Sequence, residues 1–540
     1  MNSSSKNCTT ENFLWYQWNG CLDSSYVGVH EEYTVAQKKM CARMRNAAIK
    51  CGKIVTVVVL VIQLGVLLNI CRYTFFTADD YWHAVTAGGI QNSFPELWSA
   101  AWNFMRTRFH GWQGTFFSMF LQIFLCPLNW NIPDPYRALH IILIAVCLLF
   151  FFSLYLFNRN LAIWIGYSSE WVILCGYTIL VTALLNTRSY YENFFWFSGI
   201  TSYTIPLTLS LLAGAMLLRK KGRKTVGKSG KLSDVAISIL LFLACGGSLE
   251  IALPICYVLF IWMGNRIRKR SITGAVVLAF AAAMTGTFIN GAAPGNYARH
   301  AVTAKDSGVI STLWHAGRNT LFQLFDECGR MFDASVMVVM VFTAMLLGCL
   351  AWYHLSPRVI RRSMMFAFLI VPIPALAIFP VVLGYGSVGL PERTYLMLNL
   401  SLAGVFLSFA FCAGAVLSAI WKDRLKVGTI LLLLILMAAM TDQEGLYRTY
   451  EGDFLYQLPM ATLAMDSQKG WVSRYYQDVV SFYDCIANSE EMNVAVDAGQ
   501  LLTAPKGLMP LIILDADSLA QYYGKTSISV VSDAAAETGE

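Results

Sequence analysis

The chain has 540 residues, of which 56% are hydrophobic and 14% are charged, and its mean hydropathy is +0.52. A water-soluble protein of this length needs far more charge to cover its surface, so the composition excludes a soluble globular protein and predicts a polytopic membrane protein. The net charge of +7 sits in a few stretches and therefore indicates orientation in a membrane rather than a nucleic-acid partner.

Residues 1–53 are polar, carry several lysines and arginines, and precede the first long apolar run. This flank is too long for a cleaved signal peptide, so we expect a cytoplasmic N-terminal segment followed by a retained first span. Later runs of about 20 apolar residues also fit helices, because in hydrocarbon every backbone group must be satisfied internally. The alternating segments of a transmembrane β-barrel are absent.

Residues 54–440 are predicted to form an all-α polytopic domain with about 11–13 transmembrane helices. "CGGSLE" divides residues 235–263, which are expected to form a helical hairpin with Glu250 near its outer tip. Residues 116–130 leave two interpretations open: this segment does not cross, or one of its neighbours splits into two spans. The other spans are expected near 54–71, 138–157, 161–185, 202–218, 272–289, 336–353, 364–383, 395–419 and 428–440.

Charge distribution predicts which loops share a side. Basic residues cluster at 219–231, 265–270, 354–362 and 421–426. By the positive-inside rule these stretches are cytoplasmic. The extracytoplasmic face then holds the loop 72–115, the turn at Glu250, and the polar stretches 186–199, 290–300 and 384–395.

The C-terminal residues 441–540 have an ordinary composition, in which short β-branched runs alternate with polar, helix-like stretches. They predict a small extracytoplasmic α/β domain. Most of the 14 cysteines lie inside apolar runs, and none shows metal-ligand spacing, so we expect neither disulfides nor structural zinc.

The first extracytoplasmic loop carries two adjacent acids, Asp79 and Asp80, in "FFTADDYWHA". One acid could act as general base toward an acceptor hydroxyl while the second anchors the loop. Neighbouring carboxylates also raise one another's pKa, which suits a base. The alternative is helix capping in a solvated loop, since Thr77 and Asp79 precede a plausible short helix.

Aromatic and basic residues offer candidate binding groups on the same side. In "YYENFFWFSG", the aromatic residues Tyr191 and Trp196 lie on either side of Glu192. Aromatic faces beside a carboxylate suit the binding of a sugar ring. The alternative is an aromatic girdle at the membrane interface. In "RTRFHGWQG", Arg108 or His110 could meet a phosphate, although snorkelling arginines explain many such stretches.

Two further stretches supply polar groups for a phosphate. "APGNYARH" couples a Pro-Gly turn to Asn296 and Arg299, and "GLPERTY" places Glu392 and Arg393 at the head of a span. A guanidinium reads phosphate bidentately, so these arginines fit the phosphate of a lipid carrier. Arg393 could instead pair locally with Glu392.

Motifs for nucleotide binding, dinucleotide redox chemistry, zinc proteolysis and a serine nucleophile elbow are absent. Any chemistry on the extracytoplasmic side is therefore expected to run without a cytosolic nucleotide. The sequence reveals no cofactor; it shows no divalent-metal ligand set, and it neither requires nor excludes such a metal.

The order of these parts resembles the GT-C superfamily of membrane glycosyltransferases. "ADDYWHA", "GGSLE", "APGNYAR", "PERTY" and "ADSLAQYYG" are similar to a bacterial family of GT-C-like polytopic proteins related to O-antigen glucosyltransferase-like proteins. The resemblance spans nearly the whole chain and implies a plasma-membrane location. It also implies a sugar donor on polyprenyl phosphate, and a glycan or lipid acceptor.

Carried over by motif, Asp79 matches the base of that superfamily and Asp80 its neighbour. Arg299 and Arg393 become candidates for the donor phosphate, and Glu250 matches an acidic turn. The implied reaction is inverting transfer. One departure is "HGWQG", where relatives often show an Asn-Gly-Arg-like stretch, and it weakens any role for Arg106 or Arg108.

Two other functions remain open on the sequence. A transporter or flippase of lipid-linked sugars would use the same charged residues as a pathway. Transporters usually place such groups near the bilayer midplane, often within inverted repeats, whereas here the acids sit at span ends and no repeat is evident. A non-catalytic scaffold for envelope assembly would bind partners through exposed aromatics.

Overall fold

The apolar runs of the sequence form long helices in a computed structural model of the chain. The structure describes residues 31–77, 79–186, 190–220, 228–303, 308–333, 335–351, 355–385, 390–421, 424–440, 459–497, 501, 504, 507–513 and 515–531. The chain forms two units, Met1–Val61 and Ile62–Glu540. The boundary lies inside the first described helix, and all interactions discussed below belong to the second unit.

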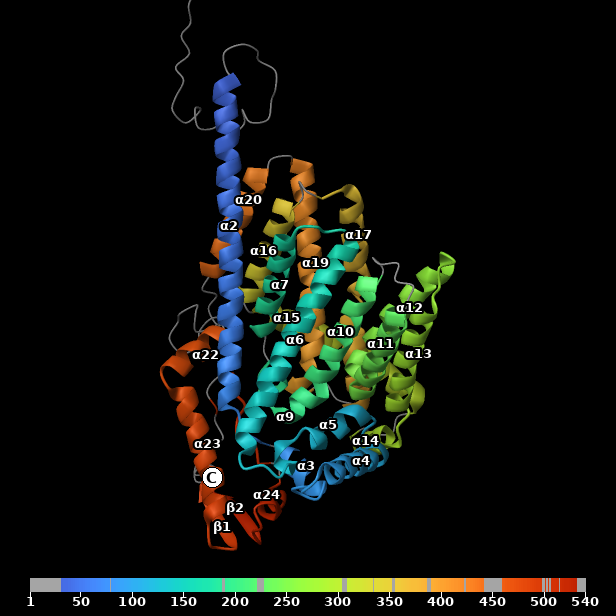
Figure 1. The fold of residues 1–540 in the computed structure, drawn as a ribbon, viewed down its shortest axis with the longest axis vertical. Coiled ribbons are helices and arrows are strands. Elements are labelled where there is room, and N and C mark those ends of the chain that lie inside the picture. Colours follow the sequence, from blue (N-terminus) through green and yellow to red (C-terminus); the bar gives the residue numbers. More distant parts are fainter. Residues whose placement is uncertain are drawn as a thin grey trace, which may run out of the picture. The chain divides into compact units, whose positions relative to one another are not determined.

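Helices dominate the described residues (Figure 1). The long helices are α2 (Glu31–Ile70), α4 (Phe94–Gly111), α6 (Pro135–Ile165), α7 (Glu170–Leu185), α10 (Ile205–Lys220), α11 (Lys228–Gly247), α12 (Leu249–Arg268), α13 (Gly274–Gly291), α15 (Val309–Asp333), α16 (Ser335–Ala351), α17 (Pro357–Ile370), α18 (Ile373–Tyr385), α19 (Tyr395–Trp421), α20 (Arg424–Met440) and α23 (Trp471–Asn488). The shorter elements are η1 (Cys71–Tyr73), α3 (Asp79–Thr86), α5 (Phe116–Phe124), η2 (Pro127–Asn129), α8 (Tyr190–Phe194), α9 (Phe197–Gly199), η3 (Ile200–Thr204), α14 (Pro294–Thr303), η5 (Glu392–Thr394), α22 (Pro459–Gln468), β1 (Asn493–Asp497), α24 (Ala516–Tyr522) and β2 (Ser527–Val531).

The predicted polytopic character is confirmed. Within the described residues, seven helices are long and apolar enough to cross a membrane, or eight if α15 and α16, which meet at a bend of 82°, are counted as one broken span. Two further apolar helices, Glu170–Leu185 and Gly428–Met437, are shorter. With the broken span and both shorter helices counted, the described residues hold ten candidate spans, fewer than the predicted 11–13.

The prediction of a break between spans at residues 158–160 is wrong. Helix α6 continues through these polar residues to Ile165, because each of them has a partner. The side chain of Asn160 donates to the carbonyl of Ala215, and Arg159 forms an ion pair of 2.7 Å with Glu170. The break comes instead at Gly166, whose φ of 122° ends the helix.

The ambiguous segment 116–130 forms only a short helix. Helix α5 ends at Phe124, and the 3₁₀ turn η2 follows. Nine residues of α-helix extend about 14 Å, roughly half the hydrocarbon thickness of a bilayer. Of the two interpretations left open by the sequence, the structure supports the one in which this segment does not cross.

Residues 235–263 form the predicted hairpin. Helices α11 and α12 meet at Ser248, and Glu250 lies in the first turn of α12. The thiols of Cys245 and Cys256, on opposite sides of the turn, are in contact. Each arm has 20 residues and extends beyond the predicted limits.

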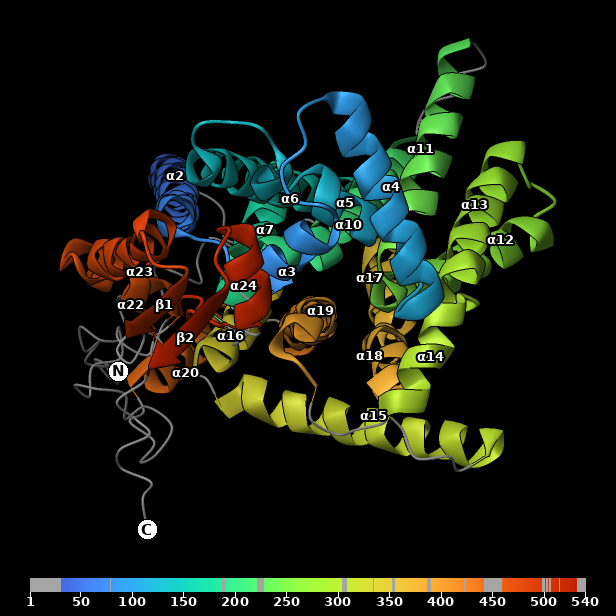
Figure 2. The same ribbon diagram turned by 90° about the horizontal axis from the view of Figure 1, so that it is seen from below.

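Two of the larger apolar clusters hold most of the long helices of the second unit. One joins α10, α11, α12 and α13 and includes Leu241 and Ala283, and the other joins α7, α15, α16, α18 and α19 and includes Leu398 and Ala403. Elements from both groups line the cavity described below. Viewed along the spans, α4 and α15 lie crosswise to helices such as α19 (Figure 2).

The described C-terminal residues contain α22, α23, α24 and a two-stranded parallel sheet, in which Asn493 pairs with Ser527 and Asp497 with Val531. Helix α24 packs on α3. These elements belong to the same unit as the spans. A separate α/β domain over 441–540 stays a prediction, and residues 441–458 and 532–540 lie outside the described part.

The orientation inferred from basic residues also stays a prediction. Residues 1–30 of the N-terminal segment lie outside the described part of the chain. Several residues within the predicted loops lie outside it as well: 187–189, 221–227, 354, 386–389 and 422–423.

Helices α16 and α19 approach so closely that a side chain at Gly414 would overlap the carbonyl oxygen of Met345. We expect Gly414→Ala to separate these helices, at a cost of about 1–3 kcal/mol for overpacking, and to lower the thermal midpoint of the detergent-solubilised protein. Gly404→Ala, in the same helix but with no atom within 4 Å of the new methyl group, is the control and should not lower it. Equal midpoints would contradict this packing.

Candidate active site

The two acids of the first loop lie in the first turn of α3 and have different surroundings. Asp80 is buried, with 1% of its surface exposed. Its Oδ2 accepts a hydrogen bond of 3.0 Å from the backbone N–H of Thr77. Its Oδ1 accepts from the N–H and the hydroxyl of Ser198, at 3.2 and 2.6 Å. Asp80 therefore caps its own helix and ties α3 to α9.

Burial raises the pKa of Asp80 to about 7, although its hydrogen bonds to Ser198 and Thr77 oppose the shift. Burial also raises the pKa of Asp79, against the lowering effect of the guanidinium groups of Arg393 and Arg108. Asp79 lines a cavity, whereas Asp80 does not. The arrangement is therefore compatible with Asp79 as base and Asp80 as anchor, and those roles stay predictions.

The C-terminal elements hold the same loop from the other side. The hydroxyl of Thr77 accepts a hydrogen bond from the N–H of Ile512 and donates to its carbonyl oxygen. The hydroxyl of Tyr483 donates to the carbonyl of Phe76, and the hydroxyls of Tyr81 and Tyr523 lie 3.1 Å apart. The position of Asp79 is thus fixed by segments more than 400 residues later in the chain.

A cavity of about 1000 Å³ brings together most of the residues proposed from sequence. Asp79, Glu250, Arg299 and Arg393 all line it, as do Trp196 and Asn296. These residues come from α3, α12, α14, η5 and the α8–α9 connection. The sequence motifs that were assigned to one face of the membrane therefore meet at one end of the bundle.

Arg393 is the main cation for the acids of the cavity. Its backbone N–H donates to Glu192 Oε2 at 2.9 Å, and its guanidinium carbon lies 5.2 Å from the ring centre of Trp196. Its charge attracts Asp79, Glu192 and Glu250. Burial raises the pKa of Glu192, and Arg393 opposes that shift.

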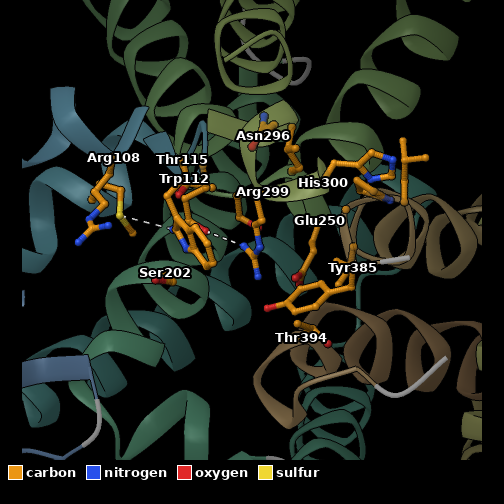
Figure 3. A pocket seen from close by; sticks show the side chains of 18 of the residues that line it. Arg108, Trp112, Thr115, Ser202, Glu250, Asn296, Arg299, His300, Tyr385 and Thr394 are labelled. Carbon is orange, nitrogen blue, oxygen red and sulfur yellow. Dashed lines mark hydrogen bonds between the residues drawn. The ribbon is translucent and has the colours of Figure 1, made fainter. Parts of the chain in front are cut away.

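Arg299 enters the cavity from α14 beside Glu250 (Figure 3). Its Nη1 donates to Gln113 Oε1 at 3.0 Å. Its guanidinium carbon lies 4.3 Å from the ring centre of Tyr385 and 5.1 Å from that of Trp112. Gln113 and two aromatic rings thus set the direction of the Arg299 guanidinium within the cavity.

Asn296 lines the cavity, but its side chain serves the backbone. Its Oδ1 accepts from the N–H of Gly114, and its Nδ2 donates to the carbonyls of Asn290 and Gly291. A side chain at Gly114 would overlap the carbonyl oxygen of Asn290, so only glycine permits this approach. Asn296 therefore holds the α4–α5 loop, with Gln113, against α14.

Arg108 lines the cavity, although the departure at "HGWQG" argues against a role for this residue. Its guanidinium carbon lies 3.8 Å above the ring centre of Trp82. Burial lowers the pKa of Arg108, and Asp79 opposes that shift. Its neighbour on the same helix, Arg106, is exposed and does not line the cavity. The 3.6-residue period of α4, which turns these two arginines to different sides, was the available sequence signal.

Three other predicted residues lie elsewhere. His110 is exposed on α4 and lines no part of the cavity, because it lies two residues after Arg108 and so faces nearly the opposite side of the helix. Tyr191 packs edge-on against Tyr190 instead of facing the cavity. Glu192 does not line the cavity; its carboxylate accepts a hydrogen bond from the backbone N–H of Arg393, which does.

Sequence reasoning also missed several cavity residues, because single aromatic and polar side chains at span ends carry no distinctive pattern. The missed residues whose side chains could bind or react with a ligand are Trp82, Gln113, Gln122, Tyr203, His300, Tyr385 and Asp515. His83 lies at the cavity wall as a neutral imidazole, since burial, followed by the charge of Arg108, lowers its pKa to about 3.

Four cavity residues carry buried polar atoms that have no hydrogen-bond partner among the described residues. They are Arg108 Nε, Thr115 Oγ1, Gln122 Oε1 and Trp196 Nε1. Buried polar groups in native proteins are nearly always satisfied, so this set of two donors and two hydroxyl or amide oxygens indicates a polar occupant. A sugar, which both donates and accepts hydrogen bonds, has the matching chemistry.

Within the described residues, no group of three or more His, Cys, Asp or Glu side chains is arranged to hold a metal ion. The cavity instead offers carboxylates, guanidinium groups and aromatic rings. No family model, no curated protein and no solved structure matches this chain.

The burial of the Asp80 carboxyl group predicts a pH-dependent stability. Since folding raises the pKa of Asp80 to about 7, the folded state binds more protons than the unfolded state between about pH 4 and pH 7. The contribution of Asp80 to stability therefore falls as pH rises through this window. Asp80→Asn removes this slope and strands a backbone donor, which costs about 1–3 kcal/mol.

The measurement is the thermal midpoint of the detergent-solubilised protein between pH 5 and pH 8. Asp478→Asn, an exposed acid on α23, is the control and should keep the wild-type slope. An Asp80→Asn protein with an unchanged midpoint and slope would refute the anchoring role.

Proposed function

We propose that this chain is a membrane glycosyltransferase of GT-C type, located in the bacterial plasma membrane. It would move a sugar from a polyprenyl-phosphate-linked donor to a glycan or lipid acceptor of the cell envelope, on the extracytoplasmic face. The observation that carries the proposal is the convergence of Asp79 with Arg299 and Arg393 on one cavity at the end of the spans.

Asp79 serves as the general base. The acceptor hydroxyl gives its proton to the Asp79 carboxylate while the hydroxyl oxygen bonds to the anomeric carbon. The bond from that carbon to the phosphate oxygen breaks, and the polyprenyl phosphate leaves with the electron pair. A pKa raised by burial favours this role, because a base works best when its pKa approaches the working pH.

The arginines stabilise the leaving group. Negative charge grows on the phosphate as the glycosidic bond breaks, and guanidinium groups fixed in advance stabilise such charge without reorganisation. Arg299, oriented by Gln113 and Tyr385, and Arg393, held by Glu192, are both preorganised in this sense. Their positions at a span end suit the headgroup depth of a lipid carrier.

The cavity offers a place for the sugar between these groups. Its volume of about 1000 Å³ accommodates a sugar together with a phosphate. The rings of Trp82 and Trp196 line it, and aromatic faces pack well against the apolar face of a sugar ring. Glu250, at the start of α12, can accept hydrogen bonds from its hydroxyl groups.

Asp79→Asn is expected to leave the protein folded and inserted but to lower sugar transfer from polyprenyl-phosphate sugar by about 10²–10⁴-fold, since the amide cannot take the proton. The measurement is transfer of radiolabelled sugar in proteoliposomes. Asp478→Asn is the matched control and should transfer at the wild-type rate. Undiminished transfer by Asp79→Asn would overturn the assignment of the base. Movement of the lipid-linked sugar across the bilayer without transfer would instead identify a flippase.

Arg108→Gln tests the electrostatics of the base. Burial raises the pKa of Asp79, and Arg108 lowers it. Removal of the Arg108 charge should therefore raise the pKa of Asp79 further. The base is then protonated at a higher pH, and the acidic limb of kcat/KM should move upward. Arg106→Gln, on the exposed side of the same helix, should leave the limb in place. An unmoved limb in Arg108→Gln, or an equal shift in both variants, would contradict the proposed coupling.

A further inference from the structure

Helix α15 exposes an apolar stripe. Ile310, Trp314, Leu321 and Phe325 follow one another at spacings of four and seven residues and lie on one face of the helix. Their exposed fractions are 86%, 72%, 53% and 73%. So much contiguous apolar surface does not stay in water, and it therefore marks an interaction face.

Polar side chains of α15 lie toward the bundle and beside the apolar stripe. The side toward the bundle buries Thr320, Gln323 and Glu327, and Gln323 accepts a hydrogen bond of 2.9 Å from the hydroxyl of Tyr395. Beside the apolar stripe, at 100° per residue, α15 exposes His315 and Arg318, with the exposed Phe322 between them. An exposed helix surface that is mostly apolar and carries polar side chains along one border is typical of the membrane interface, where apolar groups face hydrocarbon and polar groups face the headgroups.

The direction of α15 agrees with that environment. It meets α16 at a bend of 82° and is seen from its side in Figure 2, whereas α19 is seen end-on. It packs against α18, and its Gln323 bonds to the first residue of α19. Val381 of α18 and Thr394 of η5, the residue before α19, also line the cavity. Helix α15 therefore lies across the bundle at the level of the cavity.

The first two turns of α15 form part of the cavity rim. Val309 and Leu313 line the cavity, yet they remain 77% and 48% exposed. A shallow hollow, lined by Gly308 to Ser311 and by Trp314, adjoins this rim. Val309 lines both the cavity and this hollow, so the two adjoin at the first turn of α15, where the apolar stripe begins.

We propose that the first turns of α15, from Val309 to Trp314, form a lateral opening of the cavity toward the bilayer. The isoprenoid chain of the lipid-linked donor lies there against Val309, Ile310, Leu313 and Trp314. Its phosphate reaches inward to Arg299. The inference rests on the proposed function for the identity of the lipid, while the lipid-facing position of α15 follows from its own exposed residues.

Photocrosslinking tests the opening without requiring catalysis. The photoreactive residue p-benzoylphenylalanine replaces Trp314 in one variant and Phe325 in the other. Each variant is reconstituted in proteoliposomes of phosphatidylethanolamine and phosphatidylglycerol, and radiolabelled polyprenyl phosphate is the probe. Both positions lie on the apolar stripe, but only Trp314 adjoins the rim. We expect labelling at position 314 that excess unlabelled polyprenyl phosphate competes away, and only weak, non-competed labelling at position 325.

Equal, non-competed labelling at both positions would overturn the proposal, because α15 would then face bulk lipid only. Absence of any lipid adduct at position 314 would also overturn it, because a protein segment would then cover the rim.

A second measurement compares donors. Leu313→Glu should raise KM for the long-chain donor about tenfold more than KM for a water-soluble short-chain donor, since the charge removes apolar contact with the chain. Phe325→Glu, the matched control, should change neither. Equal effects of Leu313→Glu on both donors would refute the opening.

The two proposals fail in different ways. If no variant or wild-type protein transfers sugar but labelling at position 314 is competed, the opening stands and the enzymatic function fails. If transfer occurs but labelling is not competed, the function stands and the opening fails.

Discussion

The buried carboxylate of Asp80 is the constraint on which the site depends. Burying a carboxyl group is costly, and it is tolerated here because donors from Thr77 and Ser198 surround both oxygens. Adjacent residues of a helix point about 100° apart. Once Asp80 is fixed toward α9, the side chain of Asp79 is directed toward the cavity. A single buried group therefore links the start of α3 to the helical segment at Ser198 and, together with the contacts from the C-terminal elements, orients Asp79.

Around Asp79 the cavity balances acids against guanidinium groups. Arg393 attracts Asp79, Glu192 and Glu250, while Arg108 approaches Asp79 from α4. Burial raises the pKa values of Asp79 and Glu192. Arg393 opposes the shift at both acids, and Arg108 also opposes it at Asp79. An anion entering the cavity would compete for the same guanidinium groups. Binding of a phosphate would therefore alter the proton affinity of Asp79, and in the proposed reaction this would couple donor binding to the base.

Much of the helical architecture could be predicted from the sequence, because hydrocarbon leaves an apolar segment few alternatives to the helix. The hairpin at Ser248 and the span starting near Tyr395 follow from that rule. Predictions failed where tertiary partners outweighed local polarity: Asn160 stays helical because a neighbouring carbonyl accepts its amide. Helix α15 was missed because its apolar and polar residues alternate with the period of an interfacial helix, and its mean hydropathy is too low for a span.

The sequence by itself determined that the chain is a polytopic membrane protein and that acids and arginines gather at span ends, since both follow from composition and from the order of polar and apolar residues. Only the tertiary structure decided which of them share a cavity. Asp79 and Arg393 are more than 300 residues apart, so their meeting depends on how the helices pack, which no local pattern encodes. The same packing brought Arg108 into the cavity and left His110 outside it, because residues two positions apart on a helix face different sides.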